Sequence, residues 1–198
     1  MKRMPACLLV LGWTIQISFA QRTAPVDSGR TRALADALTP TLIPPPKPRP
    51  SPMAVALHKE ENIYLKVTYC QPVRKGRDVF TELAPYGKLW RTGANEATEV
   101  TLTKDVKLIG KTLRAGTYAL FTVPNADKWR IIFNAEPGQW GEYKYNTAKD
   151  VLTFEVPAQK NDEVYEAFTI RFNETNAGAD MSLMWANTKV VVPFAFTR

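Results

Sequence analysis

The residues with the clearest capacity for chemistry lie at positions 85–98, in the segment PYGKLWRTGANEAT. Trp90 offers an aromatic ring, Arg91 a forked hydrogen-bond donor, Asn95 an amide and Glu96 a carboxylate. The segment is interrupted by glycines and follows neither the period of a helix nor that of a strand. Loops of this composition hold a ligand, or fix a bend through hydrogen bonds. The sequence predicts one of these two roles for this loop.

A second unusual segment, AEPGQWGEYKY at 135–145, places Trp140 and Tyr143 around glycines. The C–H faces of sugar rings stack on aromatic side chains, while Arg, Asn and Glu hydrogen-bond the hydroxyl groups. Together the two segments predict a polar and aromatic binding site for a carbohydrate or another small polar molecule. Its predicted residues are Trp90, Arg91, Asn95, Glu96, Trp140 and Tyr143.

Glu96 is the one candidate catalytic residue. A glycosidase needs one carboxyl group to protonate the leaving oxygen and a second to attack or to activate water, and Glu136 and Glu142 flank Trp140. The other expectation is that Glu96 pairs with Arg91 and fixes the loop. A lone histidine, His58, and the absence of a nucleophile elbow or a glycine-rich phosphate loop predict no metal and no cofactor.

The N-terminal residues are those of a secretory signal peptide. Lys2 and Arg3 precede an apolar stretch at 8–19, and the small residues of the SFA motif fit cleavage after Ala20. The stretch is too short and too polar for a membrane anchor, so no transmembrane segment is expected after cleavage. We therefore expect a secreted or periplasmic protein.

Residues 21–52 form a predicted proline-rich linker, since seven prolines fall between Pro40 and Pro52. The first 52 residues hold seven of the 26 Lys and Arg residues and two of the 19 Asp and Glu residues, which leaves 19 basic and 17 acidic residues, a net charge of +2, for 53–198. A nucleic-acid partner is not expected, because such proteins concentrate positive charge on the folded domain. The sequence does not define the oligomeric state.

Short apolar segments with period two predict one domain at 53–198 built almost wholly of strands. The expected fold is all-β: an antiparallel sandwich, jelly-roll-like, with short helical turns at 78–83 and 145–150. Strands are expected at 62–69, 98–102, 106–109, 111–113, 116–123, 129–133, 151–156, 166–172, 181–185 and 189–194.

The chain resembles a secreted bacterial family, domain of unknown function 2911. The resemblance is carried by VTYCQPVRKGRDVF (67–80), LAPYGKLWRTGANEAT (83–98), LRAGTYALFTVP (113–124), WRIIFN (129–134) and QWGEYKYNTAKDVL (139–152). It covers roughly residues 52–198 and implies an exported, mostly β domain without implying an activity. Cys70 stands where the family pattern leads us to expect a small polar residue.

Three functions remain open at this point. The first is a non-enzymatic, exported binding module with a polar and aromatic pocket. The second is a carboxylate-dependent hydrolase that uses Glu96. The third is a purely structural envelope domain in which the 85–98 loop only fixes a bend.

Overall fold

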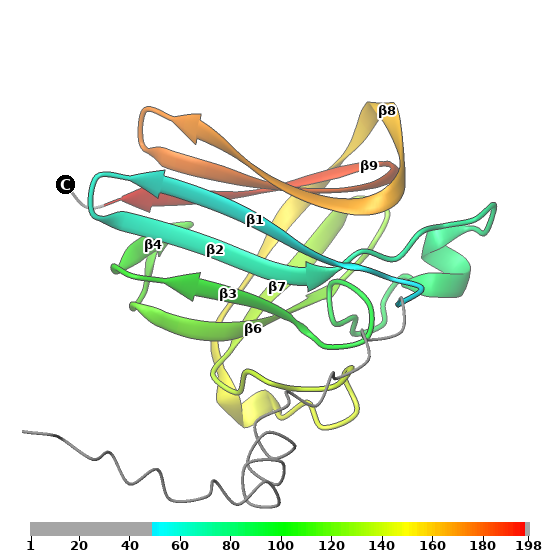
Figure 1. Ribbon diagram of the computed structural model, residues 1–198, viewed down its shortest axis with the longest axis horizontal. Coiled ribbons are helices and arrows are strands. Elements are labelled where there is room, and N and C mark those ends of the chain that lie inside the picture. Colours follow the sequence, from blue (N-terminus) through cyan, green and yellow to red (C-terminus); the bar gives the residue numbers. More distant parts are fainter. Residues whose placement is uncertain (1–48, 197–198) are drawn as a thin grey trace, which may run out of the picture. The chain divides into compact units, whose positions relative to one another are not determined.

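The computed structural model describes residues 49–196 (Figure 1). The predicted signal peptide at 1–20 and most of the predicted linker at 21–52 lie outside the described residues. The four linker residues that are described, 49–52, contact the domain: Gln71 N–H donates to the Pro52 carbonyl at 2.8 Å, and Asn95 Nδ2 donates to the Ser51 carbonyl at 3.3 Å.

Nine strands make up nearly the whole described chain, which confirms the expected antiparallel all-β class. They are β1 (Met53–Glu60), β2 (Ile63–Cys70), β3 (Thr98–Leu102), β4 (Val106–Leu108), β5 (Lys111–Leu113), β6 (Gly116–Val123), β7 (Lys128–Asn134), β8 (Asp150–Thr175) and β9 (Gly178–Phe196). Strand β1 has no counterpart among the expected strands, although its short apolar residues alternate with longer side chains. Its partner β2 alternates as predicted, with Leu65 and Val67 fully buried.

The strands are hydrogen-bonded in one continuous order, β1-β2-β3-β6-β7-β8-β9-β4-β5, and each pair of neighbours runs antiparallel. Two separate sheets of a jelly-roll-like sandwich are therefore not confirmed. The expected strands at 151–156 and 166–172 are both parts of β8, and those at 181–185 and 189–194 are both parts of β9.

Strand β8 closes the core because it bends. Its register with β9 shifts between Lys160 and Tyr165 and again between Tyr165 and Thr169. Such irregularities let a strand change direction without ending. The first part of β8 pairs with β7, and the second part carries the β8–β9 hairpin back beside β1 (Figure 1).

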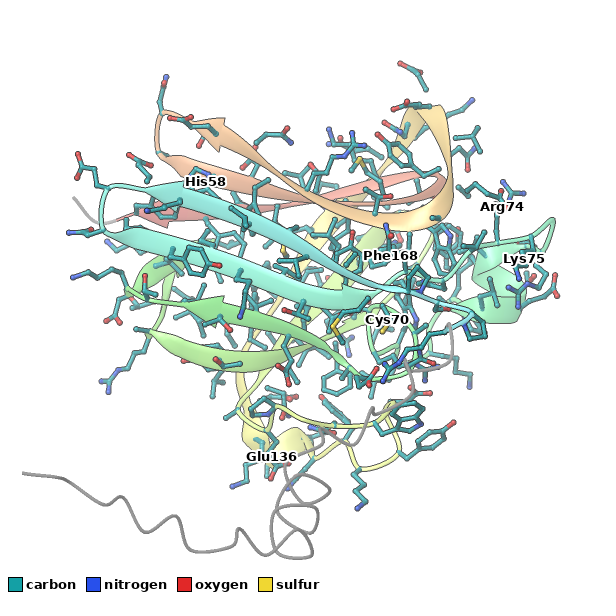
Figure 2. All side chains as sticks on the ribbon, in the orientation of Figure 1. His58, Cys70, Arg74, Lys75, Glu136 and Phe168 are labelled. Atoms are coloured by element: carbon teal, nitrogen blue, oxygen red, sulfur yellow. The ribbon has the colours of Figure 1, made fainter. Side chains whose placement is uncertain are left out.

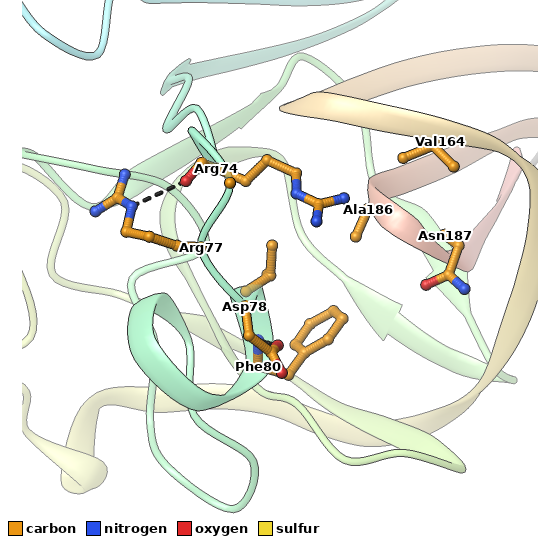
Figure 3. A pocket seen from close by; sticks show the side chains of 9 residues that line it. Arg74, Arg77, Asp78, Phe80, Val164, Ala186 and Asn187 are labelled. Carbon is orange, nitrogen blue, oxygen red and sulfur yellow. Dashed lines mark hydrogen bonds between the residues drawn. The ribbon is translucent and has the colours of Figure 1, made fainter.

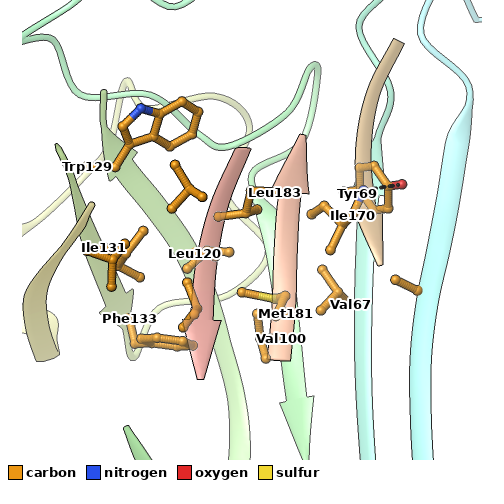
Figure 4. Packing of buried hydrophobic residues seen from close by; sticks show 14 of the residues in the cluster. Val67, Tyr69, Val100, Leu120, Trp129, Ile131, Phe133, Ile170, Met181 and Leu183 are labelled. Carbon is orange, nitrogen blue, oxygen red and sulfur yellow. Dashed lines mark hydrogen bonds between the residues drawn. The ribbon is translucent and has the colours of Figure 1, made fainter. Parts of the chain in front are cut away.

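A single hydrophobic cluster fills the space that this bend encloses. Side chains from β2, β3, β6 and β7 pack with side chains from β8 and β9, as Figure 4 shows for Met181 and Leu183 beside Val100 and Leu120. Burial of this apolar surface is the main stabilising term of the domain, in which the one described cysteine, Cys70, is free.

A smaller cluster lies on the other face of the sheet, where Ala119, Phe121 and Ile132 are buried. Tyr145 packs against it, with its ring centroid 4.9 Å from that of Phe121. This cluster holds the segment after β7 against the sheet, and that segment carries Trp140.

Two short helical turns occur at the expected places. The first, η1 (Val79–Leu83), is capped by Asp78, whose side chain accepts the Phe80 N–H at 3.0 Å. The second, η2 (Thr147–Lys149), is capped in the same way by Asn146.

Candidate functional site

Trp90 lies in the core, with 5% of its surface exposed. Its ring stacks on Trp185 at a centroid distance of 5.4 Å and meets Phe168 edge-on at 4.9 Å. The indole N–H donates to the Gly93 carbonyl at 3.0 Å, so the polar atom of this side chain is satisfied within the protein. Trp90 thus anchors the loop to the core, and it also forms part of the lining of a surface hollow.

The bend that follows Trp90 is fixed by its own hydrogen bonds. The Thr98 hydroxyl donates to the Thr92 carbonyl at 2.7 Å, and both residues are fully buried. A Cβ on Gly93 would lie 3.0 Å from both the Cys70 carbonyl oxygen and Thr98 Oγ1, so the loop and the end of β2 pack closely and a larger residue would have to displace them. The Trp90–Gly93 part of this loop therefore fits the expected structural role, in which hydrogen bonds fix a bend.

Arg91 pairs with Glu142, not with Glu96 as expected: Arg91 Nη1 lies 2.6 Å from Glu142 Oε2. The error has a simple reason, because nearness in sequence does not determine which carboxylate a folded loop meets. The pair ties the 85–98 loop to the segment that carries Trp140 and Tyr143. The Arg91 Nε atom is buried and has no hydrogen-bond acceptor within the described residues.

Glu96 pairs with Arg49, whose Nη1 lies 2.7 Å from both carboxylate oxygens. This hydrogen bond holds the pKa of the Glu96 carboxyl below its usual value. The buried thiol of Cys70 lies 3.5 Å from Glu96 Oε2. Sequence reasoning missed Arg49 and Cys70 as neighbours of Glu96, because the contacts bring together residues 47 and 26 positions apart.

Trp140 and Tyr143 are exposed, with 60% and 78% of their surfaces accessible. The backbone beneath them is nevertheless held in place: Glu96 and Trp140 form an isolated β-bridge, and Gly141 N–H donates to the Asn95 carbonyl at 2.9 Å. Gly141 has a φ of 69°, and a Cβ there would lie 2.8 Å from the Tyr143 ring. The two aromatic side chains are therefore presented to solvent by a fixed loop.

Two hollows flank the 85–98 loop. One, of about 140 Å³, is mainly apolar and has Cys70, Glu96 and Glu99 in its lining. The other, of about 250 Å³, lies against Trp90 and Arg91 on the side of the 73–77 segment. The six predicted site residues are thus near one another, but they do not line one pocket.

A third hollow, of about 430 Å³, lies beyond the 73–77 segment (Figure 3). The Arg74 side chain extends into it toward Ala186 and Asn187, and Arg74 Nε lies 3.6 Å from Glu166 Oε2. The Arg77 guanidinium lies on the opposite side of the chain in this view and donates to the Arg74 carbonyl at 2.9 Å. The basic residues of this segment, RKGR at 74–77, are a signal that sequence reasoning passed over.

Within residues 49–196, no group of three or more His, Cys, Asp and Glu side chains is arranged to hold a metal ion. His58, the single histidine, faces Phe172 and Phe196 at ring distances of 6.2 and 5.6 Å. None of the helices in this part of the chain has the length and apolar character that a membrane crossing requires.

Comparison with known proteins gives one match. No curated protein and no solved structure matches the chain. The model of one family, described as "Protein of unknown function (DUF2911)", matches residues 51–194, which include every described strand except the last residues of β9. The chain belongs to this DUF2911 family.

Proposed function

We propose that this protein is an exported, non-enzymatic module that binds a carbohydrate or another small polar ligand at the loop of Trp140 and Tyr143. The observation that carries the proposal is the exposure of these two aromatic side chains, 60% and 78%, on a loop whose backbone is fixed. Burial of such rings stabilises a domain, so large exposed aromatic surfaces point to an interaction site.

The polar groups around this loop suit a ligand with many hydroxyl groups. Arg91 and Glu142 form an ion pair that is one-quarter to one-third exposed, and each keeps hydrogen-bonding capacity beyond that pair. Glu96 and Asn95 lie on the strand-like segment that pairs with the aromatic loop. In a sugar-binding site, the sugar ring stacks on aromatic side chains while arginine and carboxylate groups bind its hydroxyl groups.

The hydrolase alternative receives less support from the same geometry. A glycosidase acid must keep its proton near neutral pH, which requires a raised pKa. Arg49 instead lowers the pKa of Glu96. The purely structural alternative explains Trp90 and Thr92 well, but it gives no reason for the exposure of Trp140 and Tyr143.

Export is the part of the proposal that rests on sequence alone, on Lys2, Arg3, the apolar stretch and the SFA motif before Gln21. Intact-mass analysis of the envelope and medium fractions should find a chain that begins at Gln21. Recovery of the full-length chain from the cytoplasm alone would contradict export.

A glycan array with the wild-type protein, followed by titration calorimetry on the best hit, tests the binding function. We expect Trp140→Ala and Tyr143→Ala each to weaken binding by about fivefold to thirteenfold, the effect of one lost stacking contact of about 1–1.5 kcal/mol. Tyr143→Phe is the matched control, because it keeps the ring and removes only the hydroxyl. Unchanged affinity in both alanine variants would refute this site.

A further inference from the structure

The hollow of about 250 Å³ beside Trp90 has an unbalanced charge. Its lining includes three cationic residues, Lys75, Arg77 and Arg91, and no acidic residue. The other lining residues are Pro50, Ser51, Pro72, Val73, Leu83, Trp90, Gly93, Ala94 and Trp185. We propose that this hollow binds a small organic anion, with a carboxylate or phosphate group on the three cations and an apolar body against the two tryptophans. Of the residues used in the proposed function, only Arg91 lines this hollow, and Trp140 and Tyr143 do not.

The three cations differ in how far the protein already neutralises them. Arg91 pairs with Glu142 through Nη1, and its guanidinium has further N–H donors beyond that pair. Arg77 donates to the carbonyls of Arg74 and Val73 at 2.9 and 2.8 Å, which orients its guanidinium without cancelling its charge. These are the conditions under which an added anion gains charge-assisted hydrogen bonds.

The Lys75 ammonium group forms no ion pair with any of the described residues. Its backbone is fixed, because the Lys75 N–H donates to Glu166 Oε1 at 2.7 Å and φ is 51°. The other oxygen of this carboxylate, Oε2, lies 3.6 Å from Arg74 Nε, and Glu166 does not line the hollow. Figure 2 shows Arg74 and Lys75 on the segment that projects from one end of the sheet.

The remaining surface of the hollow favours an apolar body over a second polar group. Trp90 and Trp185 stack on each other, and their indole N–H groups already face the carbonyls of Gly93 and Glu166. Pro72 and Leu83 add further apolar surface. The volume is below that of most drug-sized ligand pockets, so the ligand must be small.

Titration calorimetry of the wild-type protein with benzoate, phenyl phosphate, inorganic phosphate and benzyl alcohol tests the proposal. Benzoate or phenyl phosphate should bind saturably, and more weakly as the salt concentration rises. Benzyl alcohol has the ring without the charge, and inorganic phosphate has the charge without the ring; each should bind at least about tenfold more weakly, because one class of contact is lost. The two organic anions separate a carboxylate preference from a phosphate preference.

Lys75→Gln should weaken binding of the preferred anion about tenfold, since one charge-assisted contact is removed. Lys75→Arg should retain most of the affinity. Lys107→Gln is the matched control, because Lys107 is an exposed lysine on β4 that does not line the hollow. Absence of saturable binding for both organic anions, equal binding of benzyl alcohol, or equal losses in the Lys75 and Lys107 variants would each overturn the proposal.

Discussion

Replacing the two tryptophans of the candidate site separates a core residue, Trp90, from a proposed ligand contact, Trp140. Trp90 is 5% exposed, stacks on Trp185 and donates its N–H to Gly93 at 3.0 Å. Truncation of a buried tryptophan to alanine destabilises a protein by about 3–5 kcal/mol. Trp140 is 60% exposed, so Trp140→Ala should change the free energy of unfolding by only about 0.5 kcal/mol or less.

Urea unfolding followed by circular dichroism gives both free energies, and thermal unfolding provides a second measure. For a domain of this size, each kcal/mol of destabilisation lowers Tm by about 2–4 °C, so Trp90→Ala should lower Tm by roughly 6–20 °C. Trp90→Phe keeps most of the packing and loses the indole N–H, so its destabilisation should be smaller and measurable even if Trp90→Ala fails to fold. Equal stability losses at Trp90 and Trp140, or none at Trp90, would refute this account of the loop.

Three further predictions follow from other contacts. Arg49→Gln should raise the pKa of Glu96 toward its usual value, which carbon NMR measures. In the wild type the lowered pKa stabilises the fold above the usual glutamate pKa, and this stabilisation is lost as the pH falls. The stability of the variant should therefore depend less on acid pH. The pKa of Tyr145 is raised mainly by burial and further by its hydrogen bond to a carboxylate. The free energy of unfolding should therefore fall above about pH 10, where this tyrosine ionises in the unfolded chain but not in the folded one. Urea unfolding of Tyr145→Phe should show a smaller decline. Gly178→Ala should prevent folding or lower Tm severely, because its Cβ would lie 2.3 Å from a backbone oxygen, whereas Gly110→Ala, with open space around it, should lose only about 1–2 kcal/mol.

The strand content of this fold follows from local sequence, but the way the strands join does not. Alternation at 62–69 predicted β2 and its buried face because period two is a property of the strand itself. The continuity of β8 and β9 depends on register shifts near Tyr165, which have no sharp local signal such as Gly or Pro. Strand β1 was missed since alanines at its inward positions give weak apolar contrast.

The candidate site shows the same division. Residue types in the 85–98 loop indicated an unusual segment, and the glycines indicated tight turns. The partners of Arg91 and Glu96 lie 51 and 47 positions away, so pairing could not be predicted without the tertiary structure. The residues next to Trp90 and Trp140 in the sequence also do not indicate which of the two rings is buried. The difference in burial, which separates the roles of the two tryptophans, comes from the tertiary structure.

The central claim is that the loop of Trp140 and Tyr143 binds a small polar ligand. Its most direct test is titration calorimetry of the best glycan-array ligand against the wild type, Tyr143→Ala and Tyr143→Phe under identical conditions. The account predicts a loss of about fivefold to thirteenfold in affinity for Tyr143→Ala, near-wild-type affinity for Tyr143→Phe, and unchanged Tm in both. Equal affinities for the wild type and Tyr143→Ala, or the lack of any ligand on the array, would contradict it.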